Sequence, residues 1–164
     1  MDRKGIIGID CGVNGGIAFG SRICVRAINM PDTLDKLMHE LYYWSCNGNC
    51  MAYVEDVPPF VGTNRPAARI FKLAKNYGVV LGMLHALGVN YEVVRPAKWM
   101  SFVGAGKKKD HTSDNKWKNH LKRLAQKEFT ETKVTLKTAD ALLILKYGML
   151  SQRLERERNG SRTL

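Results

Sequence analysis

The sequence contains no long hydrophobic run. No stretch approaches the ~20 consecutive apolar residues that a membrane-spanning helix needs. The N-terminal segment MDRKGIIGIDCG lacks the long apolar stretch and small-residue cleavage site of a signal peptide. The 164 residues, 45% of them hydrophobic, suffice for one globular domain with a buried core. We therefore expect no membrane association and a cytoplasmic location, which would be the host cytoplasm if the chain is viral.

Cysteine is sparse as well. The four cysteines are Cys11, Cys24, Cys46 and Cys50, and in a reducing compartment they should remain thiols. Cys46 and Cys50 form a C-x3-C pair, but a zinc site needs further ligands and His39 is the only close candidate. We expect small, partly buried side chains rather than disulfides or a zinc site.

Acidic residues are few relative to basic ones, and the deficit lies in one part of the chain. The whole sequence has 26 Lys and Arg against 15 Asp and Glu, a net charge of +11. Residues 1–94 contain 9 basic and 8 acidic residues, whereas residues 95–164 contain 17 and 7. Such asymmetry is typical of a surface that binds a polyanion. It favours a nucleic acid as the partner, with ordinary solvated helix faces as the alternative.

Hydrophobic periodicity and turn residues predict an α/β domain. Strand-like runs occupy residues 4–10, 15–20, 21–30, 51–56 and 91–94, and helices are predicted at 33–45, 67–87, 97–103 and 116–127 and from Thr135 onward. The first three strands are joined by short turns and predict an antiparallel meander. Later strands alternate with helices, which indicates a mixed five-stranded sheet flanked by helices.

The domain organisation follows from the same pattern. Residues 1–150 form one domain, and residues 151–164 form a charged C-terminal tail. The long helix after Pro66, which we expect to be its first residue, has a wide apolar face. That face fits burial against the sheet, and it also fits a helix that a second subunit covers on another side. The segment GAGKKKDHTSDNK is small, polar and basic, which is typical of a mobile loop.

Three acidic residues occur where folding alone does not explain them. Asp10 ends an apolar strand, Glu55 ends another, and Asp140 lies within the apolar helix TADALLILKYG. A buried carboxylate is costly unless it has a partner or a metal. Carboxylates from separate elements are the oxygen ligands that Mg²⁺ prefers, and two such ions can catalyse phosphodiester hydrolysis.

Each acid also has a purely structural interpretation. Asp10 could be a turn residue beside Gly12, Glu55 a charge at a strand end, and Asp140 a helix cap or ion-pair partner. Neighbouring strand residues point to opposite faces, so only one of Glu55 and Asp56 can join the site. The residues alone do not decide between those two.

Six segments resemble RuvC-type Holliday junction resolvases, in the same order along the chain. They are IGIDCGVNGGIA, VEDVPPF, ARIFKLAKNYGVVLG, VRPAKW, GAG and TADALLIL, and the resemblance covers about residues 5–148. It implies a ribonuclease H-like fold, a homodimer, and Mg²⁺-dependent symmetrical nicking of four-way DNA junctions in recombination and repair. We expect two ions, for which Mn²⁺ would substitute.

The resemblance also assigns roles to individual residues. It implies that Asp10, Glu55 and Asp140 are the metal ligands, and that Lys98 lies near the scissile phosphate. A second lysine is implied at Lys116 or within 107–109. Phe60 resembles an aromatic residue that wedges into the junction centre, with an ordinary packed loop residue as the alternative. From the charge distribution we expect phosphate contacts from five lysines, namely Lys107, Lys108, Lys109, Lys116 and Lys118.

One position departs from the family pattern. Many members have an acid or a histidine one helical turn before the last aspartate, and here that residue is Lys137. We expect Lys137 and Asp140 to share a helix face, so that the lysine modulates the second metal position. The alternative is a lysine that extends into solvent.

Three other functions compete with junction resolution. The first is a related flap or fork nuclease, and the second is a catalytically inactive junction-binding protein. The third is an actin-like ATPase or sugar kinase, which shares a similar first-strand loop, but 164 residues leave no room for its second lobe.

Overall fold

The computed structural model describes residues 5–21, 24–45, 49–58 and 66–160. Its strands are β1 (Gly5–Asp10), β2 (Gly16–Gly20), β3 (Val25–Asn29), β4 (Cys50–Glu55) and β5 (Asn90–Val94). Its helices are α1 (Leu34–Ser45), α2 (Ala67–Ala86), α3 (Pro96–Phe102), the 3-10 turn η1 (Lys108–Asp110), α4 (Asp114–Glu128) and α5 (Ala139–Gly160). The order of elements is the one predicted from the sequence.

The five strands form one mixed sheet in the order β3-β2-β1-β4-β5. The first three strands pair antiparallel, and β4 and β5 add to β1 in parallel. The predicted mixed sheet is thereby confirmed. Because β1 and β4 are parallel neighbours, their carboxyl ends meet at the same edge of the sheet.

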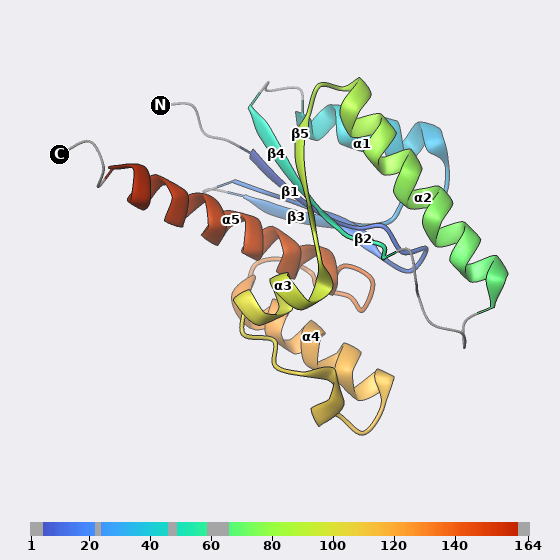
Figure 1. The fold of residues 1–164 in the computed structure, drawn as a ribbon, viewed down its shortest axis with the longest axis vertical. Helices are drawn as coiled ribbons and strands as arrows, with labels where there is room; N and C mark the ends of the chain where they lie inside the picture. The colour runs from blue at the N-terminus through green and yellow to red at the C-terminus, as the bar shows by residue number, and fades with distance from the viewer. Residues whose placement is uncertain (1–4, 22–23, 46–48, 59–65, 161–164) are drawn as a thin grey trace.

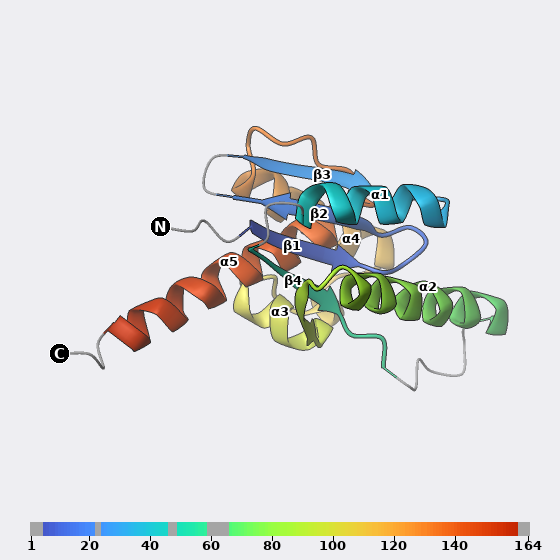
Figure 2. The same cartoon turned by 90° about the horizontal axis from the view of Figure 1, so that it is seen from above.

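Helices cover both faces of the sheet (Figures 1 and 2). Strand alternation directs Ile7, Ile9 and Val54 to one face, where they pack with α1 and α2. Tyr53 and Ala18 point to the other face, where they pack with α3, α4 and α5. Each face therefore has its own hydrophobic core.

Helix α5 lies directly against β1 because β1 has a glycine at the crossing point. A Cβ on Gly8 would collide with the carbonyl oxygen of Ala141 and the backbone nitrogen of Leu145. A close approach of this kind requires glycine. It fixes the first turn of α5, which contains Asp140, near the end of β1 that carries Asp10.

The start of α5 is capped at Thr135, the residue near which the sequence predicts it. Thr135 and Thr138 exchange side-chain hydrogen bonds with each other's backbone N–H groups and cap the helix. Lys137 lies in the turn between the capping residue Thr135 and the first residue of α5, Ala139, and its side chain is exposed. The N–H group of Ala139 donates to the carbonyl oxygen of Thr135 at 3.1 Å, so Lys137 lies in the first hydrogen-bonded turn, three residues before Asp140, and its sharing of a helix face with Asp140 stays a prediction.

Two other boundaries differ from the prediction. Helix α5 continues through residue 150 to Gly160, and Gln152 is buried, so the first part of the expected tail is helical and partly packed. The C-terminal part of this helix projects past the sheet (Figure 1). Pro66 is the cap residue before α2 rather than its first residue, with extended backbone at ψ 132°. The expected loop before α4 contains η1.

The cysteines that can be placed are thiols. Cys11 is buried, Cys50 is half-buried and Cys24 is exposed, and all three are free. Cys46 lies outside the described residues. Within the described ranges, no helix is both long and apolar enough to cross a bilayer.

Candidate active site

Asp10 ends β1, and a tight glycine turn encloses its carboxylate. The backbone N–H of Gly12 donates to Asp10 Oδ1 at 2.9 Å, and Gly15 N–H donates to the carbonyl oxygen of Gly12 at 2.8 Å. A Cβ on Gly15 would lie 2.6 Å from Asp10 Cγ. The turn therefore fits around the carboxylate only because residue 15 has no side chain.

Glu55 ends β4 beside Asp10, on the same face of the sheet. The register pairs Ile9 with Val54, so the next residue on each strand comes to the same edge. The Glu55 carboxylate accepts a hydrogen bond from Trp99 Nε1 at 2.9 Å, and Trp99 is fully buried. The α3 helix thus holds Glu55 toward the α5 face.

Asp56 points the other way. Its carboxylate accepts a long hydrogen bond of 3.5 Å from the hydroxyl group of Tyr77 on α2. Of the two neighbouring acids, the structure therefore brings Glu55 toward Asp10, as the resemblance implied, and turns Asp56 to the opposite face.

The three predicted acids share one electrostatic environment. Burial, followed by the negative charges of Asp10 and Asp140, raises the pKa of Glu55 to about 8. Burial and the charge of Asp10 raise the pKa of Asp140 to about 7. Burial also raises the pKa of Asp10 itself, against the opposing effects of the Gly12 N–H group and Lys118. Three desolvated carboxylates that repel one another are an arrangement that a cation would stabilise.

The chemistry of this group fits a hard divalent cation, since all its donors are carboxylate oxygens. Among the described residues, no three His, Cys, Asp or Glu side chains lie close enough together in their present conformations to hold a metal ion. Binding an ion would therefore require these side chains to turn toward a common point. The backbone positions of the strand ends and of the first turn of α5 already bring the three acids to the same edge.

Lys118 on α4 is the cation whose charge acts on this group. The positive charge of Lys118 lowers the pKa of Asp10 and of Asp140 and so opposes the larger upward effect of burial. The Lys118 side chain itself is exposed. Lys137 is not among the groups that shift either pKa. Of the five lysines that we expected to contact phosphates, Lys118 is therefore the one whose charge acts on the carboxylates. Lys137 is not placed in this way.

Lys98 is not brought to the carboxylates. Its ammonium group pairs with Glu92 at 3.0 Å and lies 5.6 Å from the ring centroid of Tyr147. Hydrogen bonds to these two partners raise the pKa of Lys98. The next residue, Trp99, contacts Glu55 instead. The sequence did not single out Trp99, although a buried indole N–H needs an acceptor.

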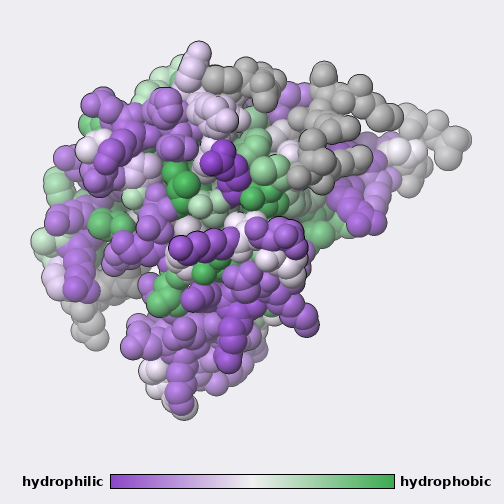
Figure 3. Space-filling model, turned by 180° about the vertical axis from the view of Figure 1, so that it is seen from behind, coloured by the Kyte–Doolittle hydropathy of each residue, from purple (hydrophilic) through white to green (hydrophobic). Residues whose placement is uncertain are grey.

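The remaining basic residues lie on the lobe that η1 and α4 form. Lys107, Lys109 and Lys116 are exposed, and Lys108 pairs with Asp114 at 2.9 Å. Figure 3 shows this lobe as an almost continuous hydrophilic surface. Phe60 lies outside the described residues, and its role as a wedge in the junction centre stays a prediction.

Solved structures provide the comparison. A scan against protein-family models and a search of curated proteins each found no match. Thermus thermophilus RuvC is similar, with a TM-score of 0.59 and 16% sequence identity over 92% of this chain and 96% of that one. T. thermophilus RuvC in complex with Holliday junction substrate gives 0.57 and 14% over the same shares.

The chain has the RuvC fold. The match confirms the predicted α/β, ribonuclease H-like architecture of five strands flanked by helices. It also agrees with the resemblance that the sequence motifs indicated.

Proposed function

We propose that this protein is a metal-dependent DNA endonuclease that resolves four-way junctions. The observation that supports it best is the meeting of Asp10, Glu55 and Asp140 at one edge of a RuvC-fold sheet, where burial raises the pKa of all three and neighbouring carboxylates raise those of Glu55 and Asp140 further. The similar T. thermophilus RuvC has been solved with a Holliday junction substrate, which makes branched DNA the substrate to test first.

The three carboxylates would hold Mg²⁺, in two positions, or Mn²⁺ in its place. When bound, such ions activate water and stabilise the leaving oxygen of phosphodiester hydrolysis. The chain's own contribution is positioning. The Gly12 N–H orients Asp10, and the Trp99 indole holds Glu55, so both acids face the first turn of α5.

We further propose a homodimer formed through the outer face of α2. Phe71 there is 69% exposed, and an added Cβ on Gly78 or Gly82 would meet nothing within 4 Å. Ala67 and Ala74 are exposed on the same side. A second copy would cover this apolar stripe, and a C2 dimer would supply one active site for each of two symmetric strands.

The exposed lysines of the η1–α4 lobe would bind the phosphates of the junction arms. Lys107, Lys109 and Lys116 have the exposure that such contacts need. Neutralising phosphates in this way provides most of the affinity of a DNA-binding surface.

The direct test is a panel of substrates incubated with Mg²⁺. We expect paired nicks at symmetric positions on opposite strands of a synthetic four-way junction, and slower cutting of a flap and of plain duplex. ATP should not be hydrolysed. Faster cutting of the flap would indicate a flap or fork nuclease, and junction binding without cutting would indicate an inactive binding protein.

A further inference from the structure

Helix α2 contacts the turn that encloses the Asp10 carboxylate. The side-chain amide of Asn76 on α2 donates to the carbonyl oxygen of Cys11 at 2.7 Å. The backbone N–H of Gly12 belongs to the same peptide group as that carbonyl, and it donates to Asp10 Oδ1 at 2.9 Å. One peptide group therefore connects a side chain of α2 with a candidate metal ligand.

The planarity of the peptide group makes this connection stiff. The described residues contain no cis peptide bond, and in a trans peptide the C=O and N–H bonds lie in one plane and point in opposite directions. A hydrogen bond that fixes the Cys11 carbonyl therefore also fixes the direction of the Gly12 N–H. Rotation of this peptide plane would weaken the bond to Asn76 and the bond to Asp10 together.

The Asn76 bond also satisfies a buried backbone group. Cys11 is 1% exposed, and β1 ends one residue before it. A buried carbonyl oxygen without a hydrogen-bond donor is costly, and here α2 supplies the donor from outside the sheet. The Asn76 side chain is itself half-buried. The bond is therefore part of the packing between α2 and the end of β1.

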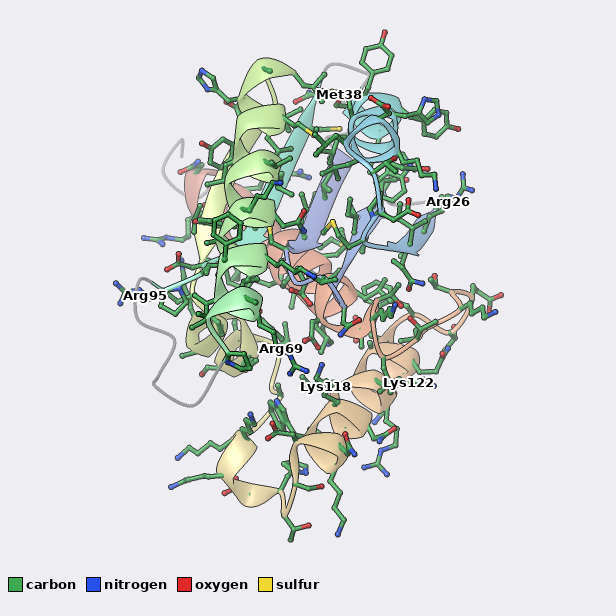
Figure 4. All side chains as sticks on the ribbon, turned by 90° about the vertical axis from the view of Figure 1, so that its right-hand side faces the viewer. Arg26, Met38, Arg69, Arg95, Lys118 and Lys122 are labelled. Carbon is green, nitrogen blue, oxygen red and sulfur yellow. The ribbon has the colours of Figure 1, made fainter. Side chains whose placement is uncertain are left out.

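The neighbours of Asn76 hold α2 in place for this contact. The hydroxyl group of Tyr77 donates to Asp56 at 3.5 Å, and Val80 is buried against the sheet. Figure 4 shows α2 along its length, with Arg69 near its start and strands of the sheet behind it. Asn76 shares the inner side of the helix with Val80, which follows one turn later. It therefore faces the turn after β1 and not the exposed apolar surface.

We propose that Asn76 is a positioning residue for metal binding, which orients the Asp10 carboxylate through the Cys11–Gly12 peptide group. Residues that hydrogen-bond to the ligands of a metal, rather than to the metal itself, typically contribute about 10–100-fold to its affinity. The role toward a metal rests on the proposed function, because it assumes that Asp10 binds one. The effect of Asn76 on the orientation of the peptide group does not depend on that function.

The first test needs neither metal nor DNA. Amide hydrogen exchange is measured by NMR in EDTA for wild type and for Asn76→Leu, which replaces the amide with an apolar group of similar size. The matched control is Thr132→Val. The Thr132 hydroxyl also donates from a distant segment to a strand carbonyl, that of Val25, at 3.2 Å. Val25 lies in register with the start of β1, at the end of the sheet away from Asp10.

We expect the Gly12 amide to exchange about five- to ten-fold faster in Asn76→Leu than in Thr132→Val, the equivalent of one hydrogen bond. Amides of α5 in the same samples report global unfolding, so the comparison uses the ratio of Gly12 exchange to theirs. Asn76→Gln keeps an amide donor and should restore part of the protection, whereas Asn76→Ala should behave like Asn76→Leu. Equal ratios in Asn76→Leu and Thr132→Val overturn the proposal.

The second test measures metal affinity directly. Electron paramagnetic resonance counts free Mn²⁺ as protein is titrated with Mn²⁺ alone. Asn76→Leu should bind Mn²⁺ about ten-fold more weakly than wild type and Thr132→Val, and Asp10→Asn should lose the site. Wild-type affinity in Asn76→Leu overturns the role of Asn76 toward the metal. Equal binding by wild type and Asp10→Asn instead contradicts the proposed function, and the exchange ratios then judge the orientation of the peptide group alone.

Discussion

The two faces of the sheet are packed in different ways. On the α5 face, Gly8 lets the helix lie directly on β1, and Gly148 makes a similarly close contact with Tyr53. On the α2 face, the helix packs through Val80 and Leu84, and an added Cβ at Gly82 would meet open space. On the α5 face, glycine therefore permits close contact between helix and strand. On the α2 face, Gly82 instead lies on the exposed side of the helix.

This difference separates two roles. The close contact on the α5 face brings Asp140 to the strand ends that carry Asp10 and Glu55. The α2 helix keeps an exposed apolar surface that we assign to a second subunit. One face therefore assembles the candidate active site, and the other would contact the second subunit that we propose.

The largest effect on stability should come from a methyl group added on the α5 face. Gly8→Ala places a Cβ against backbone atoms of Ala141 and Leu145, which cannot move without shifting the helix. We expect a loss of about 3 kcal/mol, or a Tm lower by roughly 6–12 °C. The matched control, Gly82→Ala, should raise the stability of the monomer by up to about 1 kcal/mol. Equal Tm values for the two variants would contradict the account of the α5 contact.

The next effect concerns the α2 face. Phe71→Asp introduces a charge into the proposed interface and should weaken self-association by about 2 kcal/mol or more, roughly 30-fold in Kd. Analytical ultracentrifugation measures the change. Tyr42→Asp on α1 is the control, because Tyr42 is 59% exposed but lies on another helix. Dissociation by the Tyr42 variant, or none by the Phe71 variant, would place the interface elsewhere.

The carboxylates should make metal-free stability depend on pH. The pKa values of Glu55, about 8, and of Asp140, about 7, lie above their ordinary values of 4.5 and 3.8. The folded protein therefore binds more protons than the unfolded chain between these limits, and the free energy of unfolding falls as pH rises from about 5 to about 8. We expect a loss on the order of 2 kcal/mol for Glu55 alone.

Thermal melts in EDTA check this dependence. Glu55→Gln cannot ionise, so its Tm should change less with pH than that of wild type and should exceed it at pH 8. Added Mg²⁺ should raise the wild-type Tm at pH 8 and not that of the variant. A Tm that rises with pH in both proteins would show that burial and repulsion do not raise the pKa values of these carboxylates.

The smallest effect is expected at Lys137. Since it lies in the exposed turn before α5, Lys137→Ala should leave the nicking rate and its Mg²⁺ dependence unchanged within about two-fold. Lys118→Ala is the comparison, because its charge does act on Asp10 and Asp140. A clear change with the Lys137 variant would restore the modulating role that the sequence suggested.

Much of the fold could be predicted from the sequence, because its signals are local. Alternating apolar residues mark the strands, and the turns after Asp10 and Gly20 indicate the meander. The three acids were recognisable because each interrupts an apolar segment. The motifs then distinguished Glu55 from Asp56, which alternation alone could not do.

The parts that were missed depend on how distant elements pack. Helical spacing suggested a role for Lys137 beside Asp140, but it could not show that the charge of Lys118, on α4, acts on Asp10 and Asp140. Trp99 joins the site only through the docking of α3 against the sheet. No periodicity in the sequence encodes those contacts.

The most direct test of the central claim is the nicking rate of three acid variants on a four-way junction with Mg²⁺. Asp10→Asn, Glu55→Gln and Asp140→Asn should each nick at no more than a few per cent of the wild-type rate while still binding the junction in EDTA. Asp56→Asn is the control and should retain activity, because its side chain bonds Tyr77 on the opposite face. Substantial nicking by any of the three variants, or loss of activity in the Asp56 variant alone, would contradict the assignment of the active site.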